Sequence, residues 1–161
     1  LTPEGQLRAA VKQALARGLR LDVGHGSASF SFEVARAAIA QGILPDTISS
    51  DIYCRNRLNG PVYTLAHVMS KFFNVGMTLP QIIACVTHQA ASGLRLRSKG
   101  AIEPGLDADF TLFTVAHESV SFVDAEGLAE QGNRQLIPLA AIVAGECWMT
   151  EEGKKHNVFT V

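Results

Sequence analysis

The chain contains the stretch Leu21-Asp-Val-Gly-His25-Gly-Ser-Ala-Ser-Phe30 and, further along, the stretch Ile48-Ser-Ser-Asp51. Each is a short apolar run that ends in a polar side chain able to bind a metal, His25 in the first and Asp51 in the second. In an α/β barrel the active groups lie at the carboxyl ends of the strands, where the loops open a pocket. His25 and Asp51 are therefore the first candidate site residues.

The composition indicates a folded protein without a strong electrostatic preference. Of 161 residues, 47% are hydrophobic and 18% charged, which is enough apolar material for a core and one or two small domains. The formal charge of -1 comes from 14 basic and 15 acidic residues mixed along the chain, so neither a nucleic acid nor an anionic membrane is an expected partner.

Two further features favour a cytoplasmic protein. No stretch reaches the roughly 18 apolar residues of a membrane span, and residues 1–20 lack the apolar segment of a signal peptide. The three cysteines, Cys54, Cys85 and Cys147, are odd in number and far apart, so we expect free thiols in a reducing compartment.

Helical and strand patterns alternate over the first fifty residues. The pattern predicts a helix that Thr2 caps and Gly18 ends, a strand over 19–23, a helix that Ser29 or Ser31 caps and that ends near Gly42, and a strand over 47–50. This alternation is typical of adjacent parallel strands joined by right-handed crossovers.

The remaining chain divides into a helical part and a strand-rich part. We expect an ordered loop over 52–62 that can reach over a pocket, helices over 64–75 and 78–90, and strands over 110–115, 119–123, 135–143 and 147–149. The spacing of apolar residues changes from helical to strand-like in this region, and we place a domain boundary between residues 95 and 96.

Four motifs carry a family resemblance: Arg17-Gly-Leu-Arg-Leu-Asp-Val-Gly-His-Gly26, Pro45-Asp-Thr-Ile-Ser-Ser-Asp51, Met69-Ser-Lys-Phe72 and Lys99-Gly-Ala-Ile-Glu-Pro-Gly-Leu-Asp-Ala-Asp-Phe-Thr-Leu-Phe113. Together they resemble the C-terminal part of the amidohydrolase-superfamily metallohydrolases, and within them the deacetylase and dihydroorotase-like branch. The resemblance implies a metal-dependent hydrolase that cleaves an amide or ester bond with water activated by one or two divalent metal ions, zinc above all.

The implied fold is α/β. Residues 1–95 would form the C-terminal portion of a (β/α)8 TIM-type barrel, its strands 7 and 8 with their helices, and residues 96–161 a small β-sandwich segment. The expected partners are a small-molecule substrate and the remainder of the barrel. Apolar helix faces without that remainder would also favour a homo-oligomer.

Members of the superfamily bind metal through a His-x-His pair on the first strand, a lysine or glutamate, two further histidines, and an aspartate that ends strand eight. Only the aspartate has a counterpart here, Asp51, which the resemblance implies is both metal ligand and catalytic proton acceptor. The chain has no His-x-His pair, so the other ligands are expected upstream of Leu1 and the isolated chain is expected to be inactive. An aspartate that merely caps its loop is the alternative.

His25 lies 26 residues before Asp51, which leaves room for one helix between adjacent strands. By the resemblance it therefore ends strand seven, which does not normally supply a metal ligand. The predicted substrate-binding residues are His25, Gly26, Ser27, Tyr53 and Asn59. A histidine that only bonds the backbone of its own tight turn is the alternative.

A function of another class also fits the glycine-rich turn around His25. In a stand-alone α/β module without catalysis, such a turn before a helix N-terminus would hold a small anion.

Overall fold

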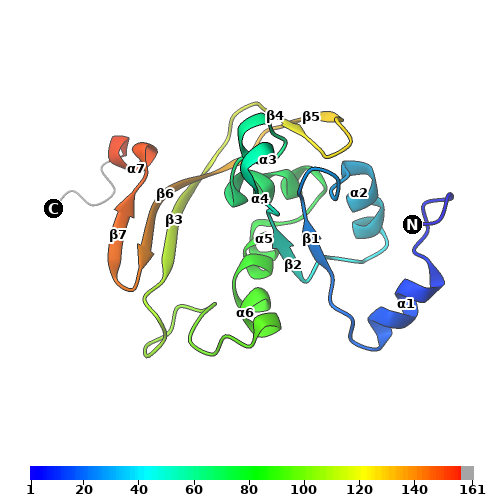
Figure 1. Ribbon diagram of the computed structural model, residues 1–161, viewed down its shortest axis with the longest axis horizontal. Helices are drawn as coiled ribbons and strands as arrows, with labels where there is room; N and C mark the ends of the chain where they lie inside the picture. Colours follow the sequence, from blue (N-terminus) through cyan, green and yellow to red (C-terminus); the bar gives the residue numbers. More distant parts are fainter. Residues whose placement is uncertain (157–161) are drawn as a thin grey trace.

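The computed structural model describes residues 1–156 (Figure 1). Its helices are α1 (Ala9–Ala16), α2 (Phe32–Ala40), α3 (Cys54–Asn59), α4 (Leu65–Asn74), α5 (Leu79–Val86), α6 (His88–Leu94) and α7 (Glu151–Lys155). Its strands are β1 (Asp22–Gly24), β2 (Thr47–Ser49), β3 (Phe110–Ala116), β4 (Val120–Val123), β5 (Ala129–Gly132), β6 (Gln135–Val143) and β7 (Glu146–Met149).

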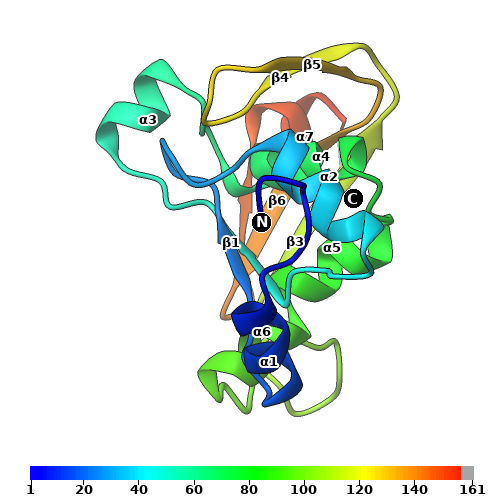
Figure 2. The ribbon, with the colours of Figure 1, turned by 90° about the vertical axis from the view of Figure 1, so that its right-hand side faces the viewer.

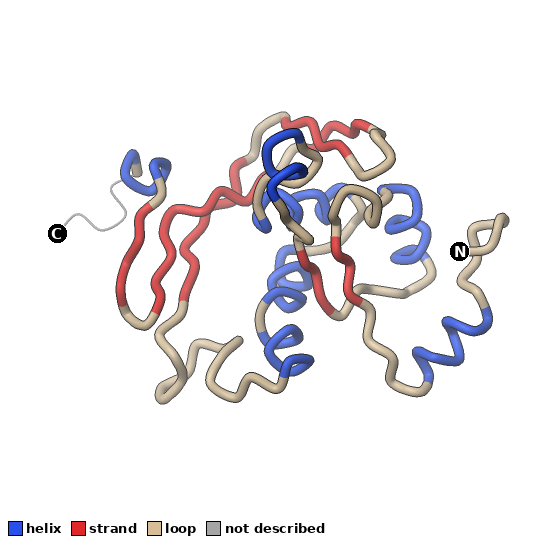
Figure 3. Tube along the Cα trace, viewed as in Figure 1, coloured by secondary structure: helices blue, strands red, loops and turns tan. Residues whose placement is uncertain are grey.

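The strands β1 and β2 form a parallel pair, with Asp22 opposite Thr47 and Gly24 opposite Ser49. The crossover between them runs through α2, so the predicted order of helix, strand, helix and strand is confirmed. Both strands are short, and β1 begins at Asp22 rather than at Leu19. Figure 3 shows the pair in red beside the helices.

One predicted helix start is placed differently by the structure, and one predicted cap makes no hydrogen bond. The first helix begins at Ala9 and not after Thr2, and none of its residues is buried. It lies on the side of the molecule that faces the viewer in Figure 2, and Figure 1 shows it apart from the other helices. The helix α2 follows Ser31, whose side chain makes no capping hydrogen bond. Instead, the Asp124 carboxylate accepts from the Phe32 amide at 3.1 Å.

The helix α4 begins after Thr64, where the sequence predicted its start, and the Thr64 hydroxyl caps it by accepting from the His67 amide at 3.0 Å. Three other expectations were wrong or incomplete. The predicted loop over 52–62 contains the helix α3, and the predicted helix over 78–90 divides at Thr87 into α5 and α6. The elements β5 and α7 were not predicted.

The strand-rich part has two pieces. The strands β3, β6 and β7 form an antiparallel sheet in the order β3-β6-β7, and β4 pairs with β5 in a hairpin. In Figure 1 the sheet extends to the left, while the hairpin lies above the helices. A closed sandwich of these strands stays a prediction.

One hydrophobic cluster joins the two parts of the chain. It includes Phe32 of α2, Phe72 of α4 and Ile82 of α5, and also Phe122 of β4 and Leu136 of β6. The predicted boundary between residues 95 and 96 falls in the connection from α6 to β3, yet residues on both sides share this core. None of the helices described here is long and apolar enough to cross a membrane.

Candidate functional site

The β1–β2 pair presents two faces of opposite character, because successive side chains of a strand point to opposite sides. A Cβ placed on Gly24 would lie 3.2 Å from the Ser49 hydroxyl and 3.5 Å from the Asp22 carboxylate, so these groups share one face. Val23 and Ile48 point the other way, into the core. We call these the polar face and the helix-packed face.

Asp51 continues the polar face beyond the carboxyl end of β2. Its Cβ lies 3.8 Å from the position a Gly24 Cβ would take, and its side chain is exposed. The backbone has a φ of 47°, a left-handed conformation that costs a non-glycine residue roughly 1–2 kcal/mol. The Asn56 amide donates to the Asp51 carbonyl oxygen at 2.9 Å and holds this turn. The carboxylate is thereby presented at the exit of the strand.

The Asp51 carboxylate fills the space beside Gly26 that a side chain would need, so only glycine fits there. The φ of 50° at Gly26 is left-handed, and a Cβ there would come closer to Asp51 Oδ2 than real carbon and oxygen atoms approach. The Gly26 amide donates to the Ser50 carbonyl oxygen at 3.1 Å, which joins the two strand exits. The turn after β1 therefore forms a wall of the Asp51 site.

Ser27 and Tyr53 connect the loops that follow the two strands. Their hydroxyl oxygens lie 3.1 Å apart, and both side chains are exposed. Asn59 is also exposed but ends α3, about 9 Å along the helix from Tyr53 at 1.5 Å per residue. The structure thus gathers Gly26, Ser27 and Tyr53 around the strand exits and leaves Asn59 farther out.

His25 lies on the helix-packed face and is fully buried. Its ring stacks on Phe30 with centroids 4.8 Å apart. Its Nδ1 lies 3.0 Å from the Gly26 carbonyl oxygen, and its Nε2 lies 2.8 Å from Lys71 Nζ. Burial lowers the pKa of the imidazole, and the Gly26 carbonyl opposes this. Direct contact of His25 with a substrate stays a prediction, and its burial weighs against it.

Lys71, on α4, is the partner of His25 and is also fully buried. Its Nζ donates to the carbonyl oxygens of Pro61 at 2.8 Å and Val123 at 2.6 Å. Burial lowers the pKa of the ammonium group to about 8, and the negative charge of Asp124 opposes the shift. Three separate segments of the chain therefore meet at one buried lysine.

Within residues 1–156, no three His, Cys, Asp or Glu side chains are close enough together to hold a metal ion. A metal centre would thus need ligands beyond those described here. Asp51 fits one such ligand, because an exposed carboxylate at a strand exit offers the oxygen donors that divalent cations bind. His25 does not fit, since both of its ring nitrogens have partners.

Sequence reasoning missed two members of this region. Asp22 accepts hydrogen bonds from the hydroxyl groups of Thr47 and Ser49, each at 2.6 Å. Because it lies two residues before Gly24 on β1, it belongs to the polar face. Lys71 is one of six consecutive buried residues of α4. Its partners lie 10 to 52 residues away in the chain, so the sequence of α4 alone gave no signal that this lysine would be buried.

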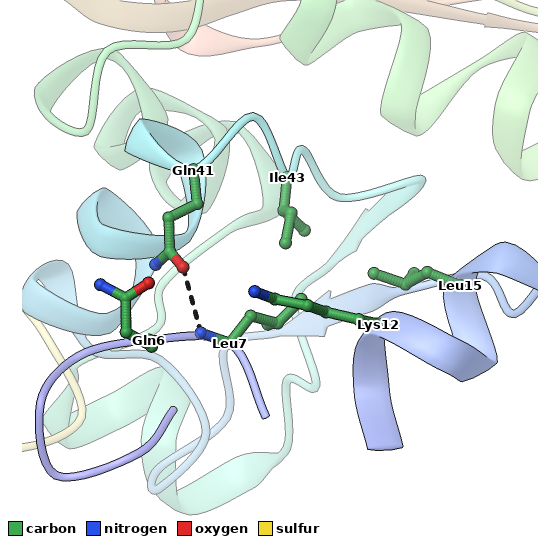
Figure 4. Close-up of a pocket in the computed structure, with 6 residues that line it drawn as sticks. All are labelled: Gln6, Leu7, Lys12, Leu15, Gln41 and Ile43. Atoms are coloured by element: carbon green, nitrogen blue, oxygen red, sulfur yellow. Dashed lines mark hydrogen bonds between the residues drawn. The ribbon is translucent and has the colours of Figure 1, made fainter. Parts of the chain in front are cut away.

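A separate hollow of about 450 Å³ lies between α1 and the end of α2 (Figure 4). Gln41 bridges it by accepting from the Leu7 amide at 3.1 Å. Its lining contains no carboxylate, histidine or cysteine, so this hollow offers no metal ligand.

Comparisons with known proteins give consistent findings. The family model of a deacetylase-like composite domain matches residues 102–148. A deacetylase of Enterococcus faecalis is 43% identical over 136 residues, which are 84% of this chain and 37% of that protein.

Solved structures agree with this similarity. The crystal structure of an adenine deaminase has a TM-score of 0.88 at 40% identity, over 90% of this chain and 39% of that chain. The crystal structure of a dihydroorotase has a TM-score of 0.80 at 36% identity, over 89% of this chain and 38% of that chain. The chain spans less than two fifths of the length of each of these three relatives.

Proposed function

Because the chain belongs to the amidohydrolase superfamily, in its deacetylase and dihydroorotase-like branch, we propose that it is part of a metal-dependent hydrolase. The reaction is cleavage of an amide or ester bond of a small molecule. In this proposal β1 and β2 are strands seven and eight of a (β/α)8 barrel, and the strands from β3 onward belong to a C-terminal β-sandwich segment.

The observation that carries the proposal is the position of the Asp51 carboxylate. It is exposed at the carboxyl end of β2, on the polar face, where barrel enzymes assemble their active groups. One Asp51 oxygen would bind a divalent metal, with zinc the first candidate, and the other would accept a proton from the attacking water and pass it to the leaving group. The metal, when bound, lowers the pKa of water and polarises the scissile carbonyl group.

The substrate side of the site is assigned to the exposed side chains of Ser27 and Tyr53 and to the buried Gly26 turn beside Asp51. The hydroxyl groups of Ser27 and Tyr53 would donate hydrogen bonds to the substrate, and the backbone of Gly26 would form the wall beside its reacting group. Asn59 would contact only a substrate that extends along α3.

The stand-alone anion-binding module has less support. Such a module would bind its ligand at the N-terminus of α2, where backbone amides are free to donate. Here the buried Asp124 carboxylate accepts from the Phe32 amide, so a carboxylate of the chain itself already lies at that end.

The test is a substrate screen with the full-length protein that carries this chain. The panel contains N-acetyl amino acids, acetylated hydroxy acids, dihydroorotate and adenine, because relatives bear the names deacetylase, dihydroorotase and adenine deaminase. We expect at least one substrate to be hydrolysed, with activity lost on chelation and restored by zinc. We also expect chain 1–161 alone to bind no stoichiometric zinc and to be inactive. Hydrolysis that survives chelation would reject the proposal.

A further inference from the structure

The ammonium group of Lys71 has three protons and, in this structure, three acceptors. Two are the carbonyl oxygens of Pro61 and Val123, which can only accept, and the third is His25 Nε2. If all three contacts are hydrogen bonds, His25 Nε2 carries no proton. The imidazole is then neutral with its proton on Nδ1.

The other side of the ring requires the same assignment. His25 Nδ1 lies 3.0 Å from the Gly26 carbonyl oxygen, which accepts and cannot donate. A neutral lysine amine that accepted a hydrogen bond from Nε2 would either leave Nδ1 without a proton, facing that oxygen, or require a buried imidazolium. Burial lowers the pKa of His25 below its ordinary 6.5, whereas the pKa of Lys71 is about 8, so the shared proton lies on the lysine. The contacts and this order of basicity together give the ammonium form of Lys71 and the Nδ1–H tautomer of His25.

This chain of hydrogen bonds ends beside the Asp51 carboxylate. The Gly26 carbonyl oxygen accepts the hydrogen bond from His25 Nδ1, and the Gly26 amide donates to the Ser50 carbonyl oxygen. The Asp51 carboxylate occupies the space that a Gly26 Cβ would need. A shift of the His25 ring would therefore move the surface on which the carboxylate lies.

We propose that Lys71 is a positioning residue for the hydrolase: through the His25 imidazole it fixes the Gly26 turn and hence the orientation of the Asp51 carboxylate. This inference rests on the proposed function for the role of Asp51. The link from Lys71 to His25 and Gly26 stands on the geometry alone. The contact with Val123 makes the β4–β5 hairpin part of the same support.

The experiment compares Lys71→Met with Ser70→Ala in the full-length, zinc-loaded enzyme. Methionine is unbranched like lysine, is only one atom shorter, and has no hydrogen-bond donor. Ser70 is the adjacent buried residue of α4, and its hydroxyl accepts from the Leu136 amide at 2.9 Å, so Ser70→Ala also breaks one buried link between α4 and the strands without touching His25.

Two readouts are measured, the 15N shifts of the His25 ring in histidine-labelled protein and the separate values of kcat and KM. In the wild type we expect the Nδ1–H tautomer. In Lys71→Met the Gly26 carbonyl oxygen still requires the proton on Nδ1, so we expect the tautomer to stay, the 15N shift of Nε2 to change with the loss of its hydrogen bond, and kcat to fall about 10- to 100-fold with KM nearly unchanged, as for a misplaced catalytic group. Ser70→Ala should keep both the Nε2 shift and kcat.

Three results would overturn the inference. The first is a wild-type His25 with its proton on Nε2, which decides the matter even if Lys71→Met does not fold. The second is a Lys71→Met enzyme with an altered Nε2 shift and an unchanged kcat. The third is an equal fall of kcat in Ser70→Ala. If Asp51→Asn instead keeps metal and turnover, the proposed function fails, whereas the tautomer still tests the lysine link.

Discussion

His25 and Asp51 follow neighbouring parallel strands at the same edge of the sheet, yet one is fully buried and the other is exposed. The difference arises because alternate residues of a strand point to opposite faces of the sheet. His25 shares the side of Val23, which packs into the core, and Asp51 shares the side of Ser49 and Gly24. A polar residue at the end of a strand is therefore a site candidate only if the alternation of side chains places it on the polar face.

The strongest test of the role of the exposed Asp51 is the substitution Asp51→Asn in the full-length enzyme. The change keeps the size of the side chain and removes its charge and basicity. We expect kcat to fall by roughly 10²- to 10⁴-fold, together with weaker metal binding. Steady-state kinetics and metal analysis measure both effects.

Asp46→Asn is the matched control, because the Asp46 carboxylate only accepts from the Leu21 amide at the opposite end of the strands. Full retention of metal and turnover in the Asp51 variant would remove Asp51 from the site.

Gly26→Ala tests the contact between the two strand exits. A methyl group there collides with the Asp51 carboxylate, so the carboxylate must move, and we expect kcat to fall by about 10²-fold. Gly42→Ala introduces the same change at a φ of 77° with no neighbouring atom within 4 Å, and it should reduce stability without reducing kcat. Equal kinetics for the two variants would show that the Gly26 contact has no catalytic role.

The buried Lys71, which contacts His25, predicts that the stability of the protein depends on pH. The pKa of Lys71 is lowered to about 8 from its ordinary value of 10.5, so between these values the unfolded chain binds more protons than the folded one. The free energy of unfolding should therefore gain up to about 1.4 kcal/mol per pH unit as pH rises from about 8.

Urea denaturation at pH 7, 8.5 and 10 measures this gain. Lys71→Met should lose it, while replacement of the exposed Lys12 by methionine should keep it. A wild-type stability that falls steadily across this range would contradict the prediction.

The smallest expected effect concerns the exposed hydroxyl pair. Ser27→Ala and Tyr53→Phe each remove one partner of the 3.1 Å contact. We expect KM to rise about fivefold, equivalent to roughly 1 kcal/mol, with metal content unchanged. Ser29→Ala, at an exposed position two residues on, is the control. A loss of metal in either variant would place these hydroxyl groups nearer to the metal than proposed.

The sequence allowed the parallel pair, the crossover helix and most of the later strands to be predicted, because each has a clear period or cap. It did not reveal α3, whose segment Cys54–Asn59 has polar residues and an Asn-Gly end typical of a loop. The break at Thr87 was also missed, since the apolar spacing continues across it. Breaks and short helices of this kind depend on contacts with distant parts of the chain, which the local sequence pattern does not contain.

The candidate site was predicted in part. Asp51 was found from the residue type at a strand end, and the structure gathers Gly26, Ser27 and Tyr53 near it. The burial of His25 was not foreseen, because its partner Lys71 is 46 residues away in the chain. Residue type and spacing carry no information about a contact of that range.

The hydrogen bonds of Lys71 and Asp124 also have a consequence for the order of folding. Val123 completes the coordination of the Lys71 ammonium group, and Asp124 caps α2, so the helices cannot satisfy these groups before the hairpin docks. A nascent chain that stops at residue 95 would hold a lysine without its third partner and a helix without its cap. Assembly of the two parts should therefore be a single cooperative event, completed only when the hairpin has left the ribosome.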